Sequence, residues 1–540
     1  MTKVKILTTS LIFSLTACLL CACVAGPVKL EQSGYPNTIA ENAKVSDKYK
    51  DVAQEISNNA IDEYIEMSDI PHRSEHETDL RNYLENWAKK NGFQPVEGPA
   101  GCMYFDVPAT KGCENYPNII LQTHMDMVVT ADETYKNIDP NSLSVSLVKD
   151  DKTGEVHSKD FHTSSGIDDG QGIGISLAIA KNKNIVHGPL RLLFTTTEEI
   201  GCMGSKFVPA EFLNADYLLN IDGSRTGEVF ISSAGYMNAN YTHTFNQTST
   251  NDNMKFMDIE VVDLIGGHSG VDIAKPRKSG SAMCIDCMNK IKEIDPSFQI
   301  VSFDSGNAYN AISKVFSLKL AVSLANYNKA KDAINEVAEN VKKECSDEKD
   351  FELNIKDMET SPAISNADSL KLTEILTKTP NGLIKMSEIQ KDVPESSANI
   401  GFLKLDSGSL RIGVSARSNN EEYMKTLLNQ FDQIGKDYNI DYKLIEDSVV
   451  PVWPSNGDNA LSKLYLSGLK EQCNLEGYEV VIHGAVEPAR FVNKHPGMLA
   501  ITIGSDVKDE HMTSETWYTK SLPITVASTL HVLENIKDIR

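Results

Sequence analysis

The chain has 540 residues, of which 41% are hydrophobic and 24% are charged. These are ordinary values for a folded globular protein, so the composition excludes a largely disordered chain and a protein with many membrane spans. The formal net charge of -23 repels phosphate backbones and anionic lipid surfaces, which excludes nucleic acid as a natural partner. The length predicts roughly two to four folded units, at about 150 residues per domain.

Residues 1–23 have the pattern of an export signal. Lys3 and Lys5 precede an apolar run that is too short to span a bilayer comfortably. The run ends near Cys18 in a Leu-Thr-Ala-Cys sequence like that of a bacterial lipoprotein signal, in which the cysteine is lipidated. We therefore expect an exported protein that is lipid-anchored to the outer face of a bacterial membrane, with residues 24–46 as a polar tether. A plain secretory signal is the alternative.

The cysteines do not form the framework of a small disulfide-rich fold. Seven of the ten lie scattered beyond the signal region. Cys284 and Cys287 are three apart on a predicted helix without a second such pair, which favours helix packing over a structural zinc site. Cys102 and Cys113 could pair in an oxidising compartment, and the sequence leaves that open.

The first part of the chain alternates helical and strand patterns. An amphipathic helix is predicted from Ser68 to Phe93, because apolar side chains recur at helical spacing before the Asn91-Gly92 stop. A second helix is predicted from Ile173 to Lys181, opened by a glycine-rich turn. Short apolar runs predict buried parallel strands, and these runs are residues 118–121, 190–194, 217–219, 480–482 and 499–503.

The middle of the chain has a different rhythm. Predicted strands at residues 257–264, 298–303 and 316–324 alternate with predicted helices at 281–291 and 329–343. The sequence therefore predicts an α/β fold with a parallel-rich sheet and an inserted α+β domain. We place the catalytic domain at residues 47–235 and 448–540, and the insertion at residues 236–447.

Five potential metal ligands follow predicted strands or turns, where open parallel sheets build their sites. They are His124, Asp168, Glu199, Asp222 and His511. Two divalent ions about 3.5 to 4 Å apart need a bridging carboxylate and terminal imidazole and carboxylate ligands. Asp168 suits the bridge, because glycines on both sides let the backbone approach the ions. Its alternative is a turn residue that caps the following helix. The pattern predicts a two-metal hydrolase.

Two further carboxylates extend this constellation. Asp126 lies two residues beyond His124, at a spacing suited to orienting the imidazole ring. Glu198 and Glu199 are adjacent, and two neighbouring carboxylates are costly unless a cation or a shared proton offsets their repulsion. One of them can therefore bind metal while the other moves a proton.

These motifs resemble the co-catalytic zinc aminoacylase and dipeptidase family, and within it the bacterial aminoacyl-histidine dipeptidases, also called cytosol non-specific dipeptidases. The resemblance extends from about Ile61 to the C-terminus. It is carried by residues 124–126, 166–170, 197–201, 220–222, 266–273 and 395–401, and by Trp453. It implies a zinc-exopeptidase-like catalytic domain, with the insertion acting as a lid.

The resemblance also implies a role for each candidate ligand. Asp168 would bridge two divalent metal ions, with zinc expected and manganese or cobalt as alternatives. His124 and Asp222 would complete one site, and Glu199 and His511 the other. The resemblance further implies that Glu198 is the general base and that Asp126 orients His124.

Three lid residues are implied to contact a small peptide substrate. His268 would stabilise the oxyanion, Asn310 would contact the substrate, and Arg417 would hold its carboxylate, for which a guanidinium fork is suited. An ordinary surface arginine is the alternative for Arg417. The implied activity is hydrolysis of dipeptides, either Xaa-His or a broad range. A homodimer through the lid is left open, and membrane contact is expected only through the lipid.

The chain departs from the family pattern at three places. His-Ala-Gly-Leu-Glu-Cys is replaced by residues 483–488 (HGAVEP), His-Ser-Pro-Asp-Glu by residues 511–515 (HMTSE), and Gly-Arg-x-Asn after the lid histidine by residues 276–279 (PRKS). Two activities on the same scaffold therefore stay open, an N-acyl amino acid deacylase and a tripeptidase. The alternative of another class is a catalytically inactive, tethered peptide-binding lipoprotein.

Overall fold

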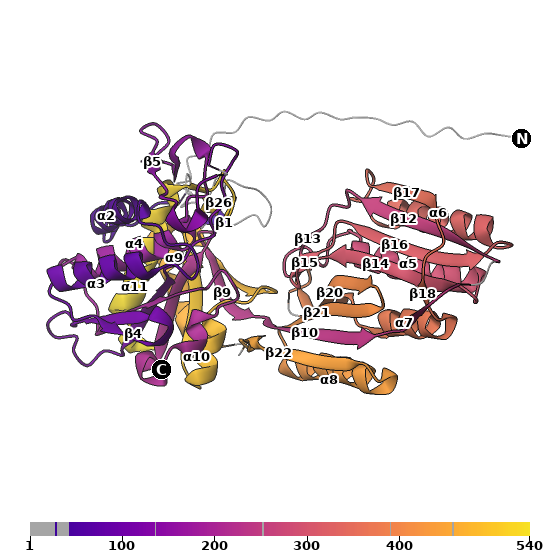
Figure 1. The fold of residues 1–540 in the computed structure, drawn as a ribbon. Coiled ribbons are helices and arrows are strands. Elements are labelled where there is room, and N and C mark those ends of the chain that lie inside the picture. Colours follow the sequence, from indigo (N-terminus) through magenta and orange to yellow (C-terminus); the bar gives the residue numbers. More distant parts are fainter. Residues whose placement is uncertain are drawn as a thin grey trace, which may run out of the picture.

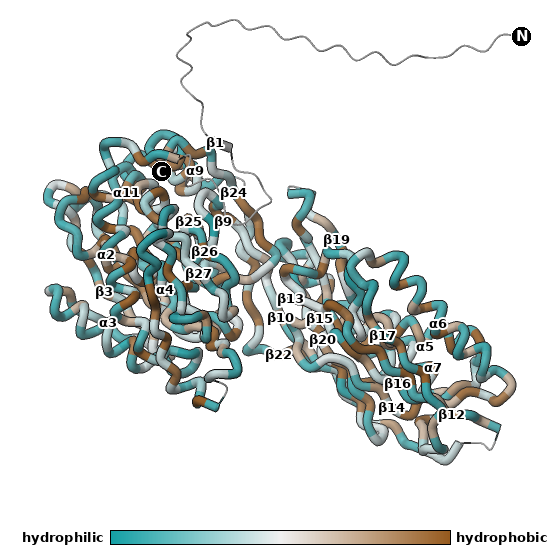
Figure 2. The backbone as a smooth tube through the Cα atoms, turned by 90° about the horizontal axis from the view of Figure 1, so that it is seen from above, coloured by the Kyte–Doolittle hydropathy of each residue, from teal (hydrophilic) through white to brown (hydrophobic). Residues whose placement is uncertain are grey.

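The computed structural model describes residues 28–29, 43–135, 137–250, 253–388, 390–455 and 458–539. Two units lie side by side (Figure 1). One combines the N-terminal part of the chain with its C-terminal part, and the other is made from the middle. Each unit has its own large hydrophobic core. Figure 2 shows hydrophobic stretches running through both units, while hydrophilic residues gather on the outer helices. The predicted α/β fold with an inserted unit is confirmed.

The first unit is built on an eight-stranded mixed sheet. Its strand order is β2-β3-β7-β4-β8-β25-β9-β24. β4 pairs in parallel with β7 and β8, and β8 pairs in parallel with β25, so the centre of the sheet is parallel. The strands are β2 (Val96–Glu97), β3 (Met103–Val107), β4 (Ile119–His124), β7 (Leu190–Thr195), β8 (Tyr217–Gly223), β9 (Glu228–Ser233), β24 (Tyr478–Ile482) and β25 (Leu499–Gly504). Each of the five apolar runs in the sequence overlaps one of these strands, although Asn118 precedes β4.

Helices pack around this sheet. They are α2 (Lys50–Ser68), α3 (Thr78–Lys90), α4 (Ile167–Lys181), α9 (Ala460–Cys473), α10 (Pro488–Lys494) and α11 (Leu522–Asn535). The predicted helix from Ser68 to Phe93 is wrong at its start, because Pro71 interrupts the helical pattern and α3 begins only at Thr78. The sequence analysis missed α2. Its buried face mixes apolar residues with Ser57 and Glu63, which weakens the helical signal.

The second unit is a nine-stranded antiparallel sheet covered by helices. Its order is β17-β12-β16-β14-β20-β21-β10-β22, and β19 pairs with β20. The strands are β10 (Gly235–Thr244), β12 (Met254–Val262), β14 (Gln299–Gly306), β16 (Phe316–Ser323), β17 (Glu352–Met358), β19 (Gly382–Met386), β20 (Pro394–Asp406), β21 (Ser409–Ser418) and β22 (Asp441–Val450). The helices are α5 (Gly280–Ile294), α6 (Tyr327–Glu344), α7 (Asn366–Lys378) and α8 (Glu421–Tyr438). The chain enters this unit through β10 and leaves it through β22 (Figure 1).

The cysteines behave as packing residues. Cys284 and Cys287 are buried in α5, and Cys102 and Cys113 are both free thiols. None of the helices among the described residues is long and apolar enough to cross a membrane. The predicted signal at residues 1–23 lies outside the described residues. Of the predicted tether, Val28–Lys29 form β1, which pairs with β23 (Leu475–Glu476), and the backbone amide of Ser46 donates to the carbonyl oxygen of Gln472.

Candidate active site

The five predicted ligands meet at the carboxyl edge of the parallel strands. His124 is the last residue of β4, Asp222 lies near the end of β8, and Glu199 follows β7. Asp168 lies at the start of α4, and His511 in the loop after β26 (Val507–Lys508). Since parallel strands end at the same edge of a sheet, segments far apart in the sequence deliver their side chains to one place.

Asp168 joins the two imidazoles of this cluster. Its Oδ1 lies 3.0 Å from His124 Nε2, and its Oδ2 lies 3.2 Å from His511 Nε2. His124 Nε2 is also 3.5 Å from Asp222 Oδ1, and His511 Nε2 is 3.0 Å from Glu199 Oε2. The carboxylate thus turns one oxygen to each half of the cluster, which is the arrangement that a bridging ligand needs.

The donor set of the cluster fits divalent cations. Burial raises the pKa of Asp222 to about 7, and the charge of Asp168 contributes to the rise. Glu199 Oε1 is buried without a hydrogen-bond partner, an arrangement that is costly unless something else satisfies the oxygen. Imidazole nitrogens and carboxylate oxygens are the ligands that zinc takes in catalytic sites. A cation pair would balance the repulsion among these buried carboxylates.

Asp126 organises the loop that carries both glutamates. Its Oδ1 accepts from the Glu198 amide at 2.9 Å, and its Oδ2 accepts from the Glu199 amide at 3.2 Å and from Ser74 Oγ at 2.8 Å. His124 Nδ1 lies 3.0 Å from the carbonyl oxygen of Asp126 and 3.5 Å from its carboxylate. The ring therefore donates best to the carbonyl, and the carboxylate mainly fixes the glutamate loop.

Glu198 lies beside the ligands without pairing with either imidazole. Its Oε1 accepts from the thiol of Cys202 at 3.2 Å. Burial raises the pKa of Glu198 well above its usual range, and Asp222 and Glu199 add to the rise, although His124 opposes it. A carboxyl group that holds its proton more tightly than usual is suited to proton transfer near neutral pH.

Two residues that support the cluster were missed in the sequence analysis. Glu515 accepts from four successive backbone amides, those of residues 165–168, at distances of 2.8 to 3.3 Å. Gly166 allows this turn because its φ is +61° and an added Cβ would lie 2.7 Å from the Tyr64 hydroxyl. Glu515 is the last residue of the HMTSE motif that begins at His511. This motif was the signal in the sequence that could have identified it.

Asp169 is the second missed residue. It is 1% exposed, and its carboxylate lies within 4.8 Å of ligand atoms of His124 and Asp222. Its Oδ2 accepts from the His124 amide at 3.2 Å, and its Oδ1 accepts from the Gly172 amide at 3.2 Å. Because both oxygens are used by the backbone, Asp168 is the better bridging ligand and Asp169 fixes the position of His124.

The three lid residues lie in different environments. Arg417 on β21 is only 5% exposed, with its guanidinium 4.2 Å from the Tyr236 ring centre and its Nε 3.4 Å from Ser269 Oγ. Burial, followed by the charge of Arg417, lowers the pKa of His268 to about 4, so this ring is neutral at neutral pH. Asn310 is exposed, and among the described residues its side chain makes no hydrogen bond, although its carbonyl oxygen accepts from the Ser269 amide.

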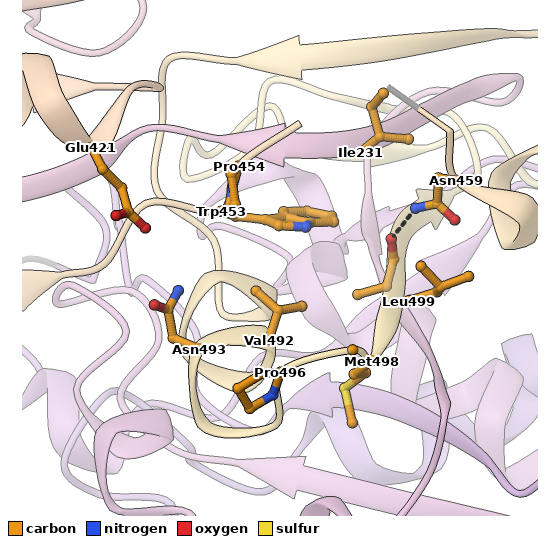
Figure 3. A pocket seen from close by; sticks show the side chains of 12 residues that line it. Ile231, Glu421, Trp453, Pro454, Asn459, Val492, Asn493, Pro496, Met498 and Leu499 are labelled. Atoms are coloured by element: carbon orange, nitrogen blue, oxygen red, sulfur yellow. Dashed lines mark hydrogen bonds between the residues drawn. The ribbon is translucent and has the colours of Figure 1, made fainter. Parts of the chain in front are cut away.

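A separate cavity of about 260 Å³ lies beside the first unit's sheet (Figure 3). Trp453, Val492, Met498 and Leu499 give it a largely apolar lining, and Asn459 donates to the carbonyl oxygen of Ala500 at its wall. None of the five candidate ligands lines it. It is therefore not the reaction site.

Buried imidazoles and carboxylates at the carboxyl edge of an α/β sheet, with an adjacent glutamate free for proton transfer, define a metal-dependent hydrolase. Residues 120–535 match peptidase family M20/M25/M40, and the chain belongs to this family. It is therefore a metallopeptidase, and the enzyme class predicted from the sequence is confirmed. The family depends on a pair of metal ions, which agrees with the two halves of the cluster.

Curated and solved relatives agree with this assignment. The chain is 27% identical over 465 residues to the cytosol non-specific dipeptidase of Escherichia coli strain K12, covering 85% of this chain and 94% of that protein. The aminoacylhistidine dipeptidase of Vibrio alginolyticus superposes with a TM-score of 0.76 at 25% identity, covering 87% of this chain and 95% of that one. A tripeptidase of Staphylococcus aureus, at a TM-score of 0.54 and 16% identity, shares the fold. The family resemblance inferred from the sequence is confirmed.

One expectation is overturned by these relatives. We predicted an exported, lipid-anchored protein, but the similar protein of Escherichia coli is a cytosol enzyme by name, which contradicts that prediction. A basic start followed by a short apolar run is a weak signal, because it depends on composition over few residues.

Proposed function

We propose that this chain is a cytoplasmic dipeptidase that hydrolyses dipeptides, either Xaa-His or a broad range, with two zinc ions as its metals. The observation that carries the proposal is Asp168, whose two carboxylate oxygens face His124 and His511 at 3.0 and 3.2 Å. In the proposed assignment Asp168 would be the ligand shared by the two ions. His124 and Asp222 would hold one ion with it, and Glu199 and His511 would hold the other.

Glu198 is the proposed general base. When bound, the metal pair supplies Lewis acidity at the scissile carbonyl and lowers the pKa of the attacking water. Glu198 takes the proton of that water and delivers it to the leaving amine. Cys202 holds one oxygen of Glu198, and Asp126 holds the backbone of the loop, so that the carboxylate stays in place.

The middle unit, residues 236–447, is proposed as a lid over a catalytic domain formed by residues 47–235 and 448–540. In this proposal Arg417 binds the carboxylate of the substrate and Asn310 contacts the substrate. His268, neutral because burial and Arg417 lower its pKa, donates a hydrogen bond to the developing oxyanion. A homodimer through the lid is a further part of the proposal, and the side chain of Asn310 is exposed to contact from outside this chain.

The proposal is tested by hydrolysis of a dipeptide panel with zinc-loaded protein. We expect cleavage of free dipeptides and poor cleavage of the same dipeptides with an amidated C-terminus, because amidation removes the charge that Arg417 binds. N-acetylated amino acids and tripeptides serve as controls for a deacylase and a tripeptidase. Faster cleavage of either control would contradict the dipeptidase assignment. Equal rates for free and amidated dipeptides would contradict the role of Arg417.

A further inference from the structure

Arg490 on α10 is a buried cation that makes no side-chain hydrogen bond or ion pair among the described residues. It is 5% exposed, and its Nε and Nη2 are buried without a hydrogen bond. Among the described residues no carboxylate forms an ion pair with it. Arg191 shows the contrast, because it is 8% exposed and donates to both carboxylate oxygens of Asp106 and to two backbone carbonyls. Buried guanidinium N–H groups without an acceptor are destabilising, so we expect a ligand to supply the acceptor.

The helix of Arg490 is fixed next to the catalytic loop. Lys494, one turn later in α10, donates to the carbonyl oxygens of Ser205, Lys206 and Val208 at 3.0, 2.6 and 2.7 Å. These residues directly follow the loop that carries Glu198. α10 also lies on the side of the first unit that faces the lid (Figure 1). The helix that carries Arg490 is thus tied to the segment that follows the Glu198 loop.

Two buried guanidinium groups act on Cys202, the residue that touches Glu198. Burial, Glu198 and Glu487 raise the pKa of the Cys202 thiol, and the charge of Arg490 opposes that rise. Arg417 of the lid is also within electrostatic reach of Cys202. One cation comes from the catalytic unit and the other from the lid, and the charge of each acts on the thiol that donates to Glu198.

Glu487, three residues away, acts on the charge of Arg490, but among the described residues it makes no hydrogen bond or ion pair with it. Its Oε2 accepts from Gln122 Nε2 at 2.5 Å and from Thr195 Oγ1 at 2.6 Å, and its Oε1 has no hydrogen-bond partner. Burial raises the pKa of Glu487 to about 7, so at neutral pH this carboxyl group carries only part of a charge. Arg490 Nε and Nη2 therefore remain without an acceptor from Glu487.

We propose that Arg490 binds the side-chain carboxylate of the C-terminal residue of the substrate, so that the enzyme prefers dipeptides ending in aspartate or glutamate. The proposal rests on the dipeptidase function proposed above. Arg417 would hold the main-chain carboxylate of the same residue, and Arg490 its side-chain carboxylate. A guanidinium recognises a carboxylate with two parallel hydrogen bonds, which gives specificity against the uncharged amide of the same shape.

The test compares kcat/KM for Ala-Glu and Ala-Gln, which are nearly isosteric, on zinc-loaded full-length protein. We expect kcat/KM of the wild type to be about 10- to 100-fold higher for Ala-Glu than for Ala-Gln, the range typical of hydrogen bonds to charged groups. Arg490→Leu should bring the ratio close to one, and Arg490→Lys should leave an intermediate ratio. Arg411→Leu removes an exposed arginine from β21 and is the charge-matched control, which should keep the wild-type ratio.

The outcomes separate this proposal from the one on which it rests. No hydrolysis of either dipeptide by the wild type would overturn the proposed function itself. Hydrolysis with equal kcat/KM for Ala-Glu and Ala-Gln, or a ratio unchanged in Arg490→Leu, would overturn the role of Arg490. A preference for Glu-Ala over Gln-Ala in place of the C-terminal preference would overturn the placement. The midpoint temperature of thermal unfolding should be no lower for Arg490→Leu than for the wild type, because the substitution removes a buried cation that has no hydrogen-bond partner. A lower midpoint with an unchanged ratio would indicate a structural role.

Discussion

Glu198→Gln is expected to reduce dipeptide turnover by about 10²- to 10⁴-fold, the contribution typical of a positioned general base. The amide keeps the size of the side chain and can still meet the Cys202 thiol, whose sulfur lies 3.2 Å from Glu198 Oε1. It cannot take up a proton from water. All five proposed ligands remain, so metal content should stay at that of the wild type. The measurement is kcat beside metal analysis on the same preparation.

Glu211→Gln is the matched control for this substitution. Glu211 is an exposed carboxylate in the segment that follows the catalytic loop, so its replacement changes the net charge equally without touching the cluster. We expect wild-type turnover and wild-type metal content. A Glu198→Gln enzyme that loses metal would reassign Glu198 as a ligand, and one with full turnover would remove it from the mechanism.

Glu199→Gln is expected to lower both metal content and turnover. Glu199 Oε2 lies 3.0 Å from His511 Nε2, and its Oε1 is buried without a partner, so this carboxylate is placed to bind an ion. An amide is a far weaker ligand, and the His511 half of the site should lose its ion. Since one remaining metal cannot recreate the paired site, added zinc should restore turnover only in part.

The opposite pattern of metal loss would contradict these roles of Glu198 and Glu199. If Glu199→Gln bound both ions while Glu198→Gln lost one, the two glutamates would exchange roles. Metal analysis after gel filtration, at equal protein concentration for both variants, decides between the two assignments.

The sequence was most informative where the chain alternates apolar strands with polar strand ends. β4, β7 and β8 were predicted because each is a short apolar run, and His124, Glu199 and Asp222 were predicted because each follows one. The parallel arrangement of these strands then brings the three side chains to one edge. Local pattern and chain order together contained enough information to place these three candidate ligands at one edge of the sheet.

Other features could not be predicted because their signal depends on tertiary contacts. Burial of Arg490 or Arg417 is invisible in the sequence, where an arginine is by default a surface residue. The role of Glu515 depends on backbone amides 347 or more residues earlier in the chain. The start of α3 was misplaced because Pro71 was given too little weight against a continuous helical pattern.

The central claim is that paired divalent metals at the Asp168 cluster make this chain a dipeptidase. The most direct measurement strips the wild-type protein with a chelator and follows dipeptide hydrolysis while zinc is added back in known amounts. We expect hydrolysis to be lost on stripping and to return fully only as the second equivalent of zinc binds. Hydrolysis that persists in metal-free protein, or that is complete with one equivalent, would contradict it.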